Sequence, residues 1–279
     1  QSAVSDMGPG TSTAMVKIGS ELMGITPDKV DFEMGDTDLP PGPTQGGSGS
    51  TSAVGTAITA VCDEMKKNLK ELAIANADGF KNSKADELDY AGGNIFLKND
   101  NTTKIHFTDL LKQSNKPLLE IVKDAERLSA EARKYAMNSF SVHFVKLHVH
   151  PFTGVIQLKH IVSTADAGKI IAYHPARSQM VGGAVGGVGM ALTEETLVDA
   201  RYGRYINANF ADYHVPVHAD IPKIDVLFTD QPDYIINPMG SKGIGEIALV
   251  GVAPAVANAV YNATGKRIRT LPITPDKLL

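Results

Sequence analysis

The sequence predicts an α+β fold in which mixed sheets pack against helices. Apolar residues recur at helical spacing in some segments and alternate in others, and the two kinds of segment do not follow the strict strand–helix alternation of a doubly wound sheet. The 279 residues are 43% hydrophobic and 21% charged. This ordinary globular composition excludes a disordered chain, a collagen and a coiled coil.

Charge, cysteine content and apolar length exclude further classes. Lys and Arg number 27 against 31 Asp and Glu, so the chain lacks the basic excess that nucleic-acid binding requires. The single cysteine, Cys62, cannot form an internal disulfide, a cysteine-type zinc site or an iron–sulfur cluster, since each needs several sulfurs. The most apolar stretch, 247–260, contains Pro254 and Asn258 and at about 14 residues is too short to cross a bilayer, so we expect a soluble chain, cytoplasmic or periplasmic.

Two helices are expected to dominate the first half. Gly8-Pro9-Gly10 forms a turn before a helix that reaches Met23 and stops at Gly24. A longer helix begins at Thr51, where apolar residues follow the 3.6-residue period. The other expected elements are a strand over 30–34, a loop over 36–49, strands over 94–97 and 104–107, and a short helix from Thr108.

The second half is expected to contain a hairpin and two buried helices. A charged stretch, 123–134, separates two apolar-rich parts, and we place a boundary between lobes 1–137 and 138–279. Alternating runs at 140–150 and 155–163 flank a Pro-Phe-Thr-Gly turn, which predicts a hairpin. The remaining expected elements are a helix over 178–197, a strand over 224–229 and a helix over 248–261.

Small and hydroxyl-bearing residues, Gln45 to Ser52, lead directly into the long helix. Glycines let the backbone approach a ligand closely, and the free N–H groups at a helix start favour an anion. The segment is typical of a phosphate cradle, but it lacks the lysine of a P-loop and the spacing of a dinucleotide fingerprint. A flexible loop followed by a Ser or Thr cap is the alternative.

Glycines recur within the helical pattern from Gly182 to Gly189. Each costs about 1 kcal/mol relative to alanine in a helix, so close packing against a neighbouring element is the expected reason for them. Gln179, just before these glycines, has an uncharged side chain with two donors and an acceptor. Such a side chain could bind the edge of a heterocycle.

The segment from Pro238 to Val250 joins a glycine-framed loop to an apolar helix. Glu246 stands at the head of that helix, where the helix dipole favours the ionised carboxylate and burial opposes it. The residue is either a cap or a catalytic base.

His148 and His150 stand two residues apart and would share one face of a strand, which is metal-ligand spacing. No third ligand is evident, and a solvent-facing strand near a turn explains the pair equally well. A metal site is therefore the less favoured interpretation.

The order of several short motifs carries a resemblance to a known family. These motifs are Asp6-x-Gly8-x-Gly10-Thr11, Met34-Gly35-Asp36-Thr37, Gly46-Gly47-Ser48, Asp166-Ala167-Gly168, Ser178-Gln179 and Lys242-Gly243-Ile244-Gly245-Glu246. In this order the chain resembles the C-terminal half of the molybdenum-binding subunit of the xanthine dehydrogenase and aldehyde oxidase family. It is most similar to bacterial aldehyde dehydrogenases with separate iron–sulfur, FAD and molybdenum subunits.

The resemblance implies a molybdenum–molybdopterin cofactor, in bacteria usually the cytosine dinucleotide form, held mainly by backbone and hydroxyl contacts of a domain with two α/β lobes and needing no cysteine ligand to the metal. It implies that Glu246 is the catalytic base and that Gln179 contacts the pterin. The other implied cofactor-binding residues are Gly8, Pro9, Gly10, Ser48, Gly49, Ser50 and Thr51 at the pterin and phosphates, and Lys242, Gly243, Ile244 and Gly245 beside the metal.

The implied reaction is oxidation of an aldehyde or an N-heterocycle with oxygen from water. Hydride would pass to the molybdenum centre and electrons to 2Fe-2S and FAD groups on partner subunits or domains. Family subunits carry a further N-terminal half, so we expect this chain to be a fragment that is inactive alone. A non-catalytic nucleotide- or phosphate-binding or assembly module is the main alternative, and a metal hydrolase at His148 and His150 is a more distant one.

Overall fold

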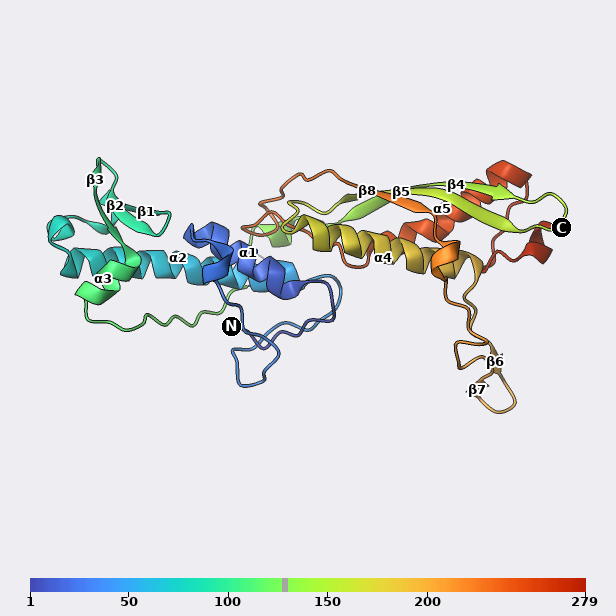
Figure 1. Cartoon of the computed structure of the whole chain (residues 1–279), viewed down its shortest axis with the longest axis horizontal. Helices are drawn as coiled ribbons and strands as arrows, with labels where there is room; N and C mark the ends of the chain where they lie inside the picture. The colour runs from blue at the N-terminus through green and yellow to red at the C-terminus, as the bar shows by residue number, and fades with distance from the viewer. Residues whose placement is uncertain (127–129) are drawn as a thin grey trace. The chain divides into compact units, whose positions relative to one another are not determined.

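The computed structural model describes residues 1–126 and 130–279, which divide into two compact units. Unit 1 comprises 1–136 and 234–240, and unit 2 comprises 137–233 and 241–279. Helices and small sheets occur in both units (Figure 1), which confirms the predicted α+β class. The functional division into lobes 1–137 and 138–279 stays a prediction, and residues 127–129 of the charged stretch lie outside the described residues.

The two helices that the sequence predicts for the first half of the chain pack side by side in unit 1. They are α1 (Thr11–Met23) and α2 (Ser50–Asn76). The Ile18 side chain lies against Gly55, and Met23, at the end of α1, packs on the cluster that the later turns of α2 form with the small sheet. The two helices therefore run in the same direction, and both begin at the same end of unit 1.

A three-stranded antiparallel meander completes the core of unit 1. Gly92 and Gly93, both with left-handed backbone (φ 55° and 77°), form the two-residue turn between its first two strands. The sequence predicted the second strand and part of the third but missed the first. The elements are β1 (Leu88–Ala91), β2 (Asn94–Leu97), β3 (Asp100–His106) and the short helix α3 (Phe107–Gln113).

The predicted strand over 30–34 is wrong. Burial does alternate along it, with Phe32 inside, but Met34 forms only an isolated bridge to Ser2. The neighbouring segment is the start of the chain, which hydrogen-bonds to Glu33 and Gly35 over too few residues to make a ladder. Alternating burial therefore predicted the buried side correctly but not a paired strand.

The sheet of unit 2 has the order β4-β5-β8. The predicted hairpin is confirmed as β4 (Phe140–Val149) and β5 (Ile156–Asp166), which pair antiparallel over their full length. The strand β8 (Lys223–Phe228) pairs parallel to β5. A parallel pair needs a crossover connection, and the helix α4 (Tyr173–Leu192) lies in that connection.

Helix α5 (Ile247–Thr264) packs along α4 through glycines. A Cβ added to Gly183 would lie 2.7 Å from Ala248 Cβ, and one added to Gly187 would lie 2.6 Å from Val252 Cβ. These separations confirm close packing as the reason for Gly183 and Gly187, whereas a Cβ added to Gly182 would meet no atom within 4 Å. Gly183 and Gly187 are one turn apart on α4, and the residues that they contact are one turn apart in the same order on α5. The two helices therefore run parallel.

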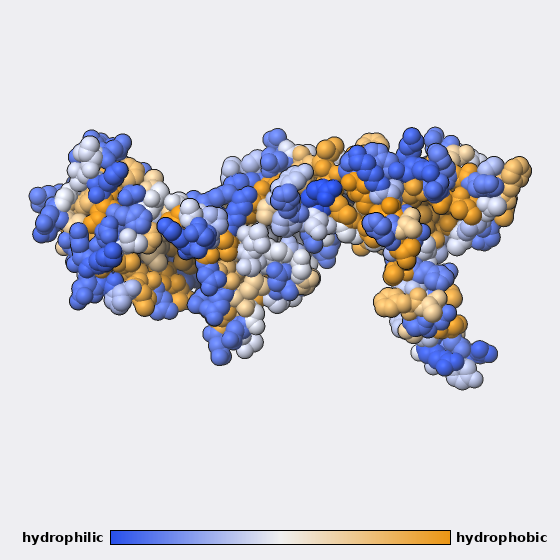
Figure 2. Space-filling view, in the orientation of Figure 1, coloured by the Kyte–Doolittle hydropathy of each residue, from blue (hydrophilic) through white to orange (hydrophobic). Residues whose placement is uncertain are grey.

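Helix α4 lies five residues earlier than the predicted span of 178–197. Pro175 falls in its first turn, where a missing N–H costs little, so the helix begins before the proline rather than after it. At its other end the chain turns away after Thr193 into the two-residue strands β6 (Val198–Asp199) and β7 (Arg204–Tyr205). Figure 2 shows apolar residues at the surface of this segment, where Val198 is exposed.

Helix α5 confirms the predicted helix over 248–261 and extends beyond it to Thr264, with Pro254 in its interior. Proline removes the helical bond to the carbonyl of Val250, and Val250 lies on the exposed side, where water can satisfy that carbonyl. Over 18 residues its mean hydropathy is 1.4, so by length and composition alone α5 could cross a membrane. This is weak evidence, because a core helix meets the same criterion and α5 packs on α4 and β4.

Short 3₁₀ helices occupy several turns of the described chain. They are Pro27–Lys29, Asp78–Phe80, Ala85–Glu87, Ala132–Lys134, His218–Asp220 and Pro275–Leu278.

Candidate functional site

The glycine turn before α1 is held by an aspartate. Gly8 and Gly10 adopt left-handed conformations (φ 109° and 82°). Asp6 Oδ1 accepts a hydrogen bond from Gly8 N–H at 2.8 Å, and its Oδ2 accepts one from Thr11 N–H at 2.9 Å. The carboxylate therefore shapes the turn, and it engages the N–H group of Gly8, which the sequence analysis assigned to cofactor binding. An Asp two residues before a Gly is the sequence signal for such a turn.

The loop before α2 contains an unusual backbone and an unsatisfied donor. Gly47 and Ser48 are both left-handed (φ 60° and 56°), and Gly49 is the N-cap. Ser50 Oγ donates to Gln45 Oε1 at 2.9 Å, whereas Gln45 Nε2 is buried and has no hydrogen-bond partner among the described residues. A buried unpaired amide costs free energy, so this donor points to a group that the isolated chain lacks. Sequence reasoning placed Gln45 in the loop without giving it this role.

The glycines of these two loops are not explained by packing. A Cβ added to Gly8, Gly46 or Gly47 would meet no atom within 4 Å, in contrast to Gly183 and Gly187 on α4. The Asp6 carboxylate lies against the first N–H group of α1, whereas the first turn of α2 contains no acidic residue to compensate the positive end of its helix dipole. Open glycine backbone at helix starts suits the phosphates of a dinucleotide-type cofactor.

The loops lie at the same end of unit 1, because α1 and α2 run in the same direction. The residues predicted from sequence at this end are Gly8, Pro9, Gly10, Ser48, Gly49, Ser50 and Thr51. Packing of the two helices thus brings the first two predicted segments into one neighbourhood of the unit.

In unit 2, Lys242 is engaged within the protein. Its Nζ lies 2.9 Å from Asp166 Oδ2, and the two side chains are only 10% and 19% exposed. Lys242 N–H also donates to Ala167 O, and Ser241 bridges Gly168. These contacts fasten the start of the loop 242–246 to the end of β5. Partial burial alone would raise the pKa of Asp166, but hydrogen bonds from Lys242 and from Gly168 N–H hold it below its ordinary value.

Glu246 is the N-cap residue of α5, and it is exposed rather than buried as sequence reasoning assumed. Gln179 lies one helical turn before Gly183, and the loop 243–246 lies just before Ala248, the residue that Gly183 contacts. The parallel packing of α4 and α5 therefore places Gln179 at the level of this loop. Unit 2 brings together the predicted pterin contact, the glycine loop and the predicted base.

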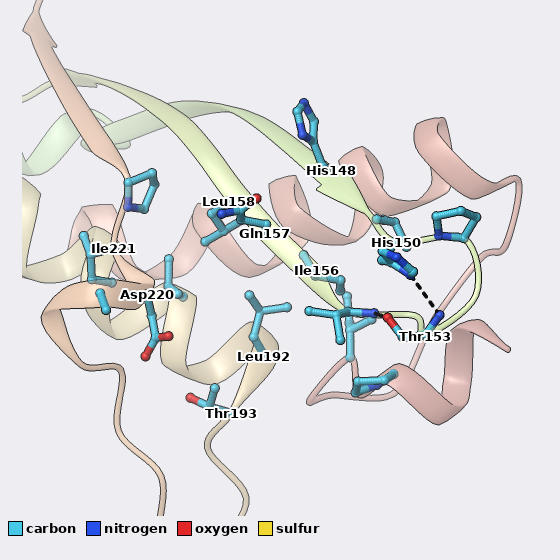
Figure 3. Close-up of a pocket in the computed structure, with 18 residues that line it drawn as sticks. His148, His150, Thr153, Ile156, Gln157, Leu158, Leu192, Thr193, Asp220 and Ile221 are labelled. Carbon is cyan, nitrogen blue, oxygen red and sulfur yellow. Dashed lines mark hydrogen bonds between the residues drawn. The ribbon is translucent and has the colours of Figure 1, made fainter.

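The two histidines flagged in the sequence lie elsewhere in unit 2, beside a cavity of about 910 Å³ (Figure 3). His148 is on β4, whereas His150 lies just beyond the strand, where its Nδ1 accepts a hydrogen bond from Thr153 N–H at 3.2 Å. None of the residues predicted to bind cofactor lines this cavity. Within residues 1–126 and 130–279 no group of three or more His, Cys, Asp or Glu is placed to hold a metal ion, so the pair has no third ligand there.

Comparison with known proteins gives a family match over most of the chain. The model for the molybdopterin cofactor-binding domain matches residues 1–222. This range contains both glycine loops of unit 1 and Gln179, and it ends before Lys242 and Glu246.

Two relatives with named activities are similar over almost the whole chain. The molybdenum-binding subunit PaoC of an aldehyde oxidoreductase from Escherichia coli K12 is 35% identical over 276 residues, which are 99% of this chain and 36% of PaoC. The molybdenum-binding subunit of xanthine dehydrogenase from Escherichia coli O157:H7 is 30% identical over 295 residues, covering 100% of this chain and 37% of that subunit. The chain thus spans little more than a third of these relatives.

A solved structure shows the same fold. The reconstituted CO dehydrogenase from Oligotropha carboxidovorans superposes with a TM-score of 0.84 at 24% identity, covering 99% of this chain and 34% of that one.

Proposed function

The chain belongs to the molybdopterin cofactor-binding domain family, and from this we propose that it forms part of the molybdenum subunit of a hydroxylase that oxidises aldehydes. The family match over residues 1–222, which contains the two open glycine loops, carries the proposal. The 35% identity to an aldehyde oxidoreductase subunit favours an aldehyde over an N-heterocycle as substrate.

Unit 1 would bind the phosphates of the cofactor, in its cytosine dinucleotide form. The loops Gly8–Gly10 and Ser48–Thr51 offer backbone N–H groups and hydroxyls at two helix starts. Gln45 Nε2 would donate the hydrogen bond that it lacks in the isolated chain. Bound molybdenum would supply the redox centre and the Lewis acidity for the oxidation.

Unit 2 would orient the pterin and handle the proton. Gln179 would hydrogen-bond the pterin edge through its amide. Gly243, Ile244 and Gly245 would bring their backbone close to the metal centre, on a loop whose start Lys242 holds through Asp166. Glu246 would accept, at its carboxylate, the proton of the water-derived hydroxyl whose oxygen is transferred to the aldehyde carbon.

The remaining parts of the reaction would lie outside this chain. We propose that the rest of the subunit supplies further cofactor contacts and the substrate channel, and that 2Fe-2S and FAD partners take the electrons. Cys62, a single buried thiol on α2, cannot ligate such a cluster by itself. The chain alone would then bind cofactor weakly and have no turnover.

The test uses a full-length subunit that contains this chain and assays aldehyde oxidation with an artificial electron acceptor. Glu246→Gln should lower kcat by about a hundredfold or more, because an amide cannot accept the proton, while thermal stability stays unchanged. Glu71→Gln, on the exposed side of α2, is the matched control and should retain activity.

Near-normal turnover by the Glu246→Gln variant would refute the base assignment. A subunit that binds a nucleotide or phosphate without any turnover would instead favour the binding-module alternative, for which the exposed position of Glu246 is the supporting observation.

A further inference from the structure

A chain of hydrogen bonds crosses the β4–β5 hairpin and ends on α5. Ser163 Oγ lies 2.8 Å from His143 Nδ1, and His143 Nε2 lies 2.9 Å from Ser141 Oγ. Ser141 Oγ in turn donates to Ile247 O at 3.0 Å. Ile247 is the first residue of α5 and directly follows Glu246. The chain therefore reaches the backbone next to the predicted base.

The chemistry of the last link sets the direction of the others. A carbonyl oxygen can only accept, so the Ser141 hydroxyl proton is committed to Ile247 O and Ser141 Oγ must accept from His143 Nε2–H. A neutral imidazole with its proton on Nε2 then accepts from Ser163 through Nδ1. Burial lowers the pKa of His143, which favours this neutral form. Ser163 is itself fully buried, so bulk water does not compete with His143 for its hydroxyl proton.

Close packing of α5 on β4 makes the link to Ile247 feasible. Gly251, one turn after Ile247, lies directly on the His143 ring, and a Cβ at this position would collide with the ring. The glycine therefore lets the first turn of α5 approach within hydrogen-bonding distance of Ser141.

The two ends of the loop 242–246 are held by the same hairpin. Lys242 fastens the start of the loop to Asp166, the last residue of β5, and to Ala167 in the turn that follows. Ser141 fastens its end to β4, at the position paired with Ala165. The loop spans two neighbouring anchors, and the second depends on His143.

We propose that His143 is a positioning residue for Glu246, acting through Ser141 on the first turn of α5. The inference rests on the role proposed for Glu246. His143 touches neither substrate nor cofactor in this account, and its contribution is to hold the backbone from which the Glu246 carboxylate projects.

Two amide variants separate the two sides of the imidazole. In His143→Gln the amide nitrogen takes the place of Nε2 and can still donate to Ser141. In His143→Asn the shorter amide reaches only the position of Nδ1, where its oxygen can accept from Ser163, and Ser141 is left without its donor. Ser141→Ala removes the link to Ile247 altogether.

Hydrogen–deuterium exchange of the first turns of α5 reads out the network without any cofactor. We expect His143→Asn and Ser141→Ala to speed exchange there by about five- to tenfold, and His143→Gln to stay within about twofold of the unaltered protein. Nitrogen chemical shifts of the His143 imidazole should place the proton on Nε2. Equal exchange in the Gln and Asn variants would overturn the proposal.

Turnover of the full-length subunit then tests positioning. His143→Asn and Ser141→Ala should lower kcat by about tenfold with KM unchanged, and His143→Gln should restore it. If exchange changes but kcat does not, while Glu246→Gln is inactive, positioning is refuted and the proposed function stands. If Glu246→Gln keeps normal turnover, the proposed base fails, and the positioning role fails with it.

Discussion

Lys242 shows how one residue type supports more than one interpretation. The family resemblance implies that it lines a glycine loop beside the metal centre, whereas in the structure its ammonium pairs with Asp166 at 2.9 Å. A partly buried pair of this kind is costly to break, because the remaining charge would lose its partner. Lys242 therefore anchors the start of the loop. The glycines that follow it are the residues whose backbone can approach a ligand closely.

The Lys242–Asp166 pair should make stability depend on pH in the acid range. The folded pKa of Asp166 lies below its ordinary value, so the unfolded chain takes up the proton at higher pH than the folded one. The stabilisation is present above about pH 4 and is lost as the pH falls through the folded pKa. Asp166→Asn should flatten this loss when the free energy of unfolding is measured at pH 7 and pH 3.

Asp86→Asn, an exposed aspartate in unit 1, is the control and should keep the pH dependence of the unaltered protein. An Asp166→Asn variant that lost as much stability in acid as the unaltered protein would show that the pair contributes nothing.

Gly46 offers a test of the cradle that does not disturb the fold. Its φ lies outside the left-handed region, and an added methyl group would meet no atom within 4 Å. Gly46→Ala should therefore change the free energy of unfolding by no more than about 0.5 kcal/mol. In the full-length subunit we expect it to reduce molybdenum content, because the methyl group would occupy space needed by the phosphates. Equal molybdenum content in the variant would argue against a close approach at this loop.

Residue roles were predictable only where a local pattern carried them. Glu246 at the head of α5 follows from the sequence, because an apolar helix plainly begins after it. The Asp6 contacts were within reach, since they join neighbours in the chain. The network through His143 was not, because Ser141 and Ile247 are 106 residues apart and only the packed fold joins them.

At the scale of elements, the glycines of α4 determine how the helices of unit 2 pack. The face that contains Gly183 and Gly187 admits Ala248 and Val252 of α5, which brings the two backbones close together. The sequence indicated a packed face but not the partner or its direction. That direction matters for function, because only the parallel arrangement places Gln179 at the level of the loop before Glu246.

Two glycine substitutions on α4 should have opposite effects. Gly187→Ala places a methyl group 2.6 Å from Val252 Cβ and should destabilise the protein by about 1–3 kcal/mol through overpacking. Gly182→Ala faces open space and should stabilise it by up to about 1 kcal/mol through helix propensity. Denaturant unfolding measures both. Equal effects of the two substitutions would refute glycine-mediated packing.

Element boundaries failed where context outweighed pattern. The strand over 30–34 lacked a neighbouring strand long enough to pair with, although its burial alternates as predicted. Helix α4 began before Pro175, because the first turn of a helix tolerates proline. Long periodic segments such as α2, by contrast, were predictable because one apolar face extends over many turns.

At the scale of the whole molecule, the predicted cofactor-binding residues divide between the two units. The loops before α1 and α2, for which we propose phosphate binding, belong to unit 1, and Gln179, Lys242 and Glu246 belong to unit 2. The chain spans 36% of the length of PaoC, so a large part of that relative has no counterpart here. We therefore expect the full-length subunit, rather than this chain, to retain the cofactor.

The most direct test is the molybdenum and pterin content of the full-length subunit, measured together with its turnover of an aldehyde. We predict stoichiometric molybdenum and pterin in the active subunit, and neither at that level in the purified 279-residue chain. Turnover by a subunit that contains no molybdenum would contradict the central claim. Stoichiometric molybdenum in the 279-residue chain alone would contradict the proposal that this chain needs the rest of the subunit to retain the cofactor.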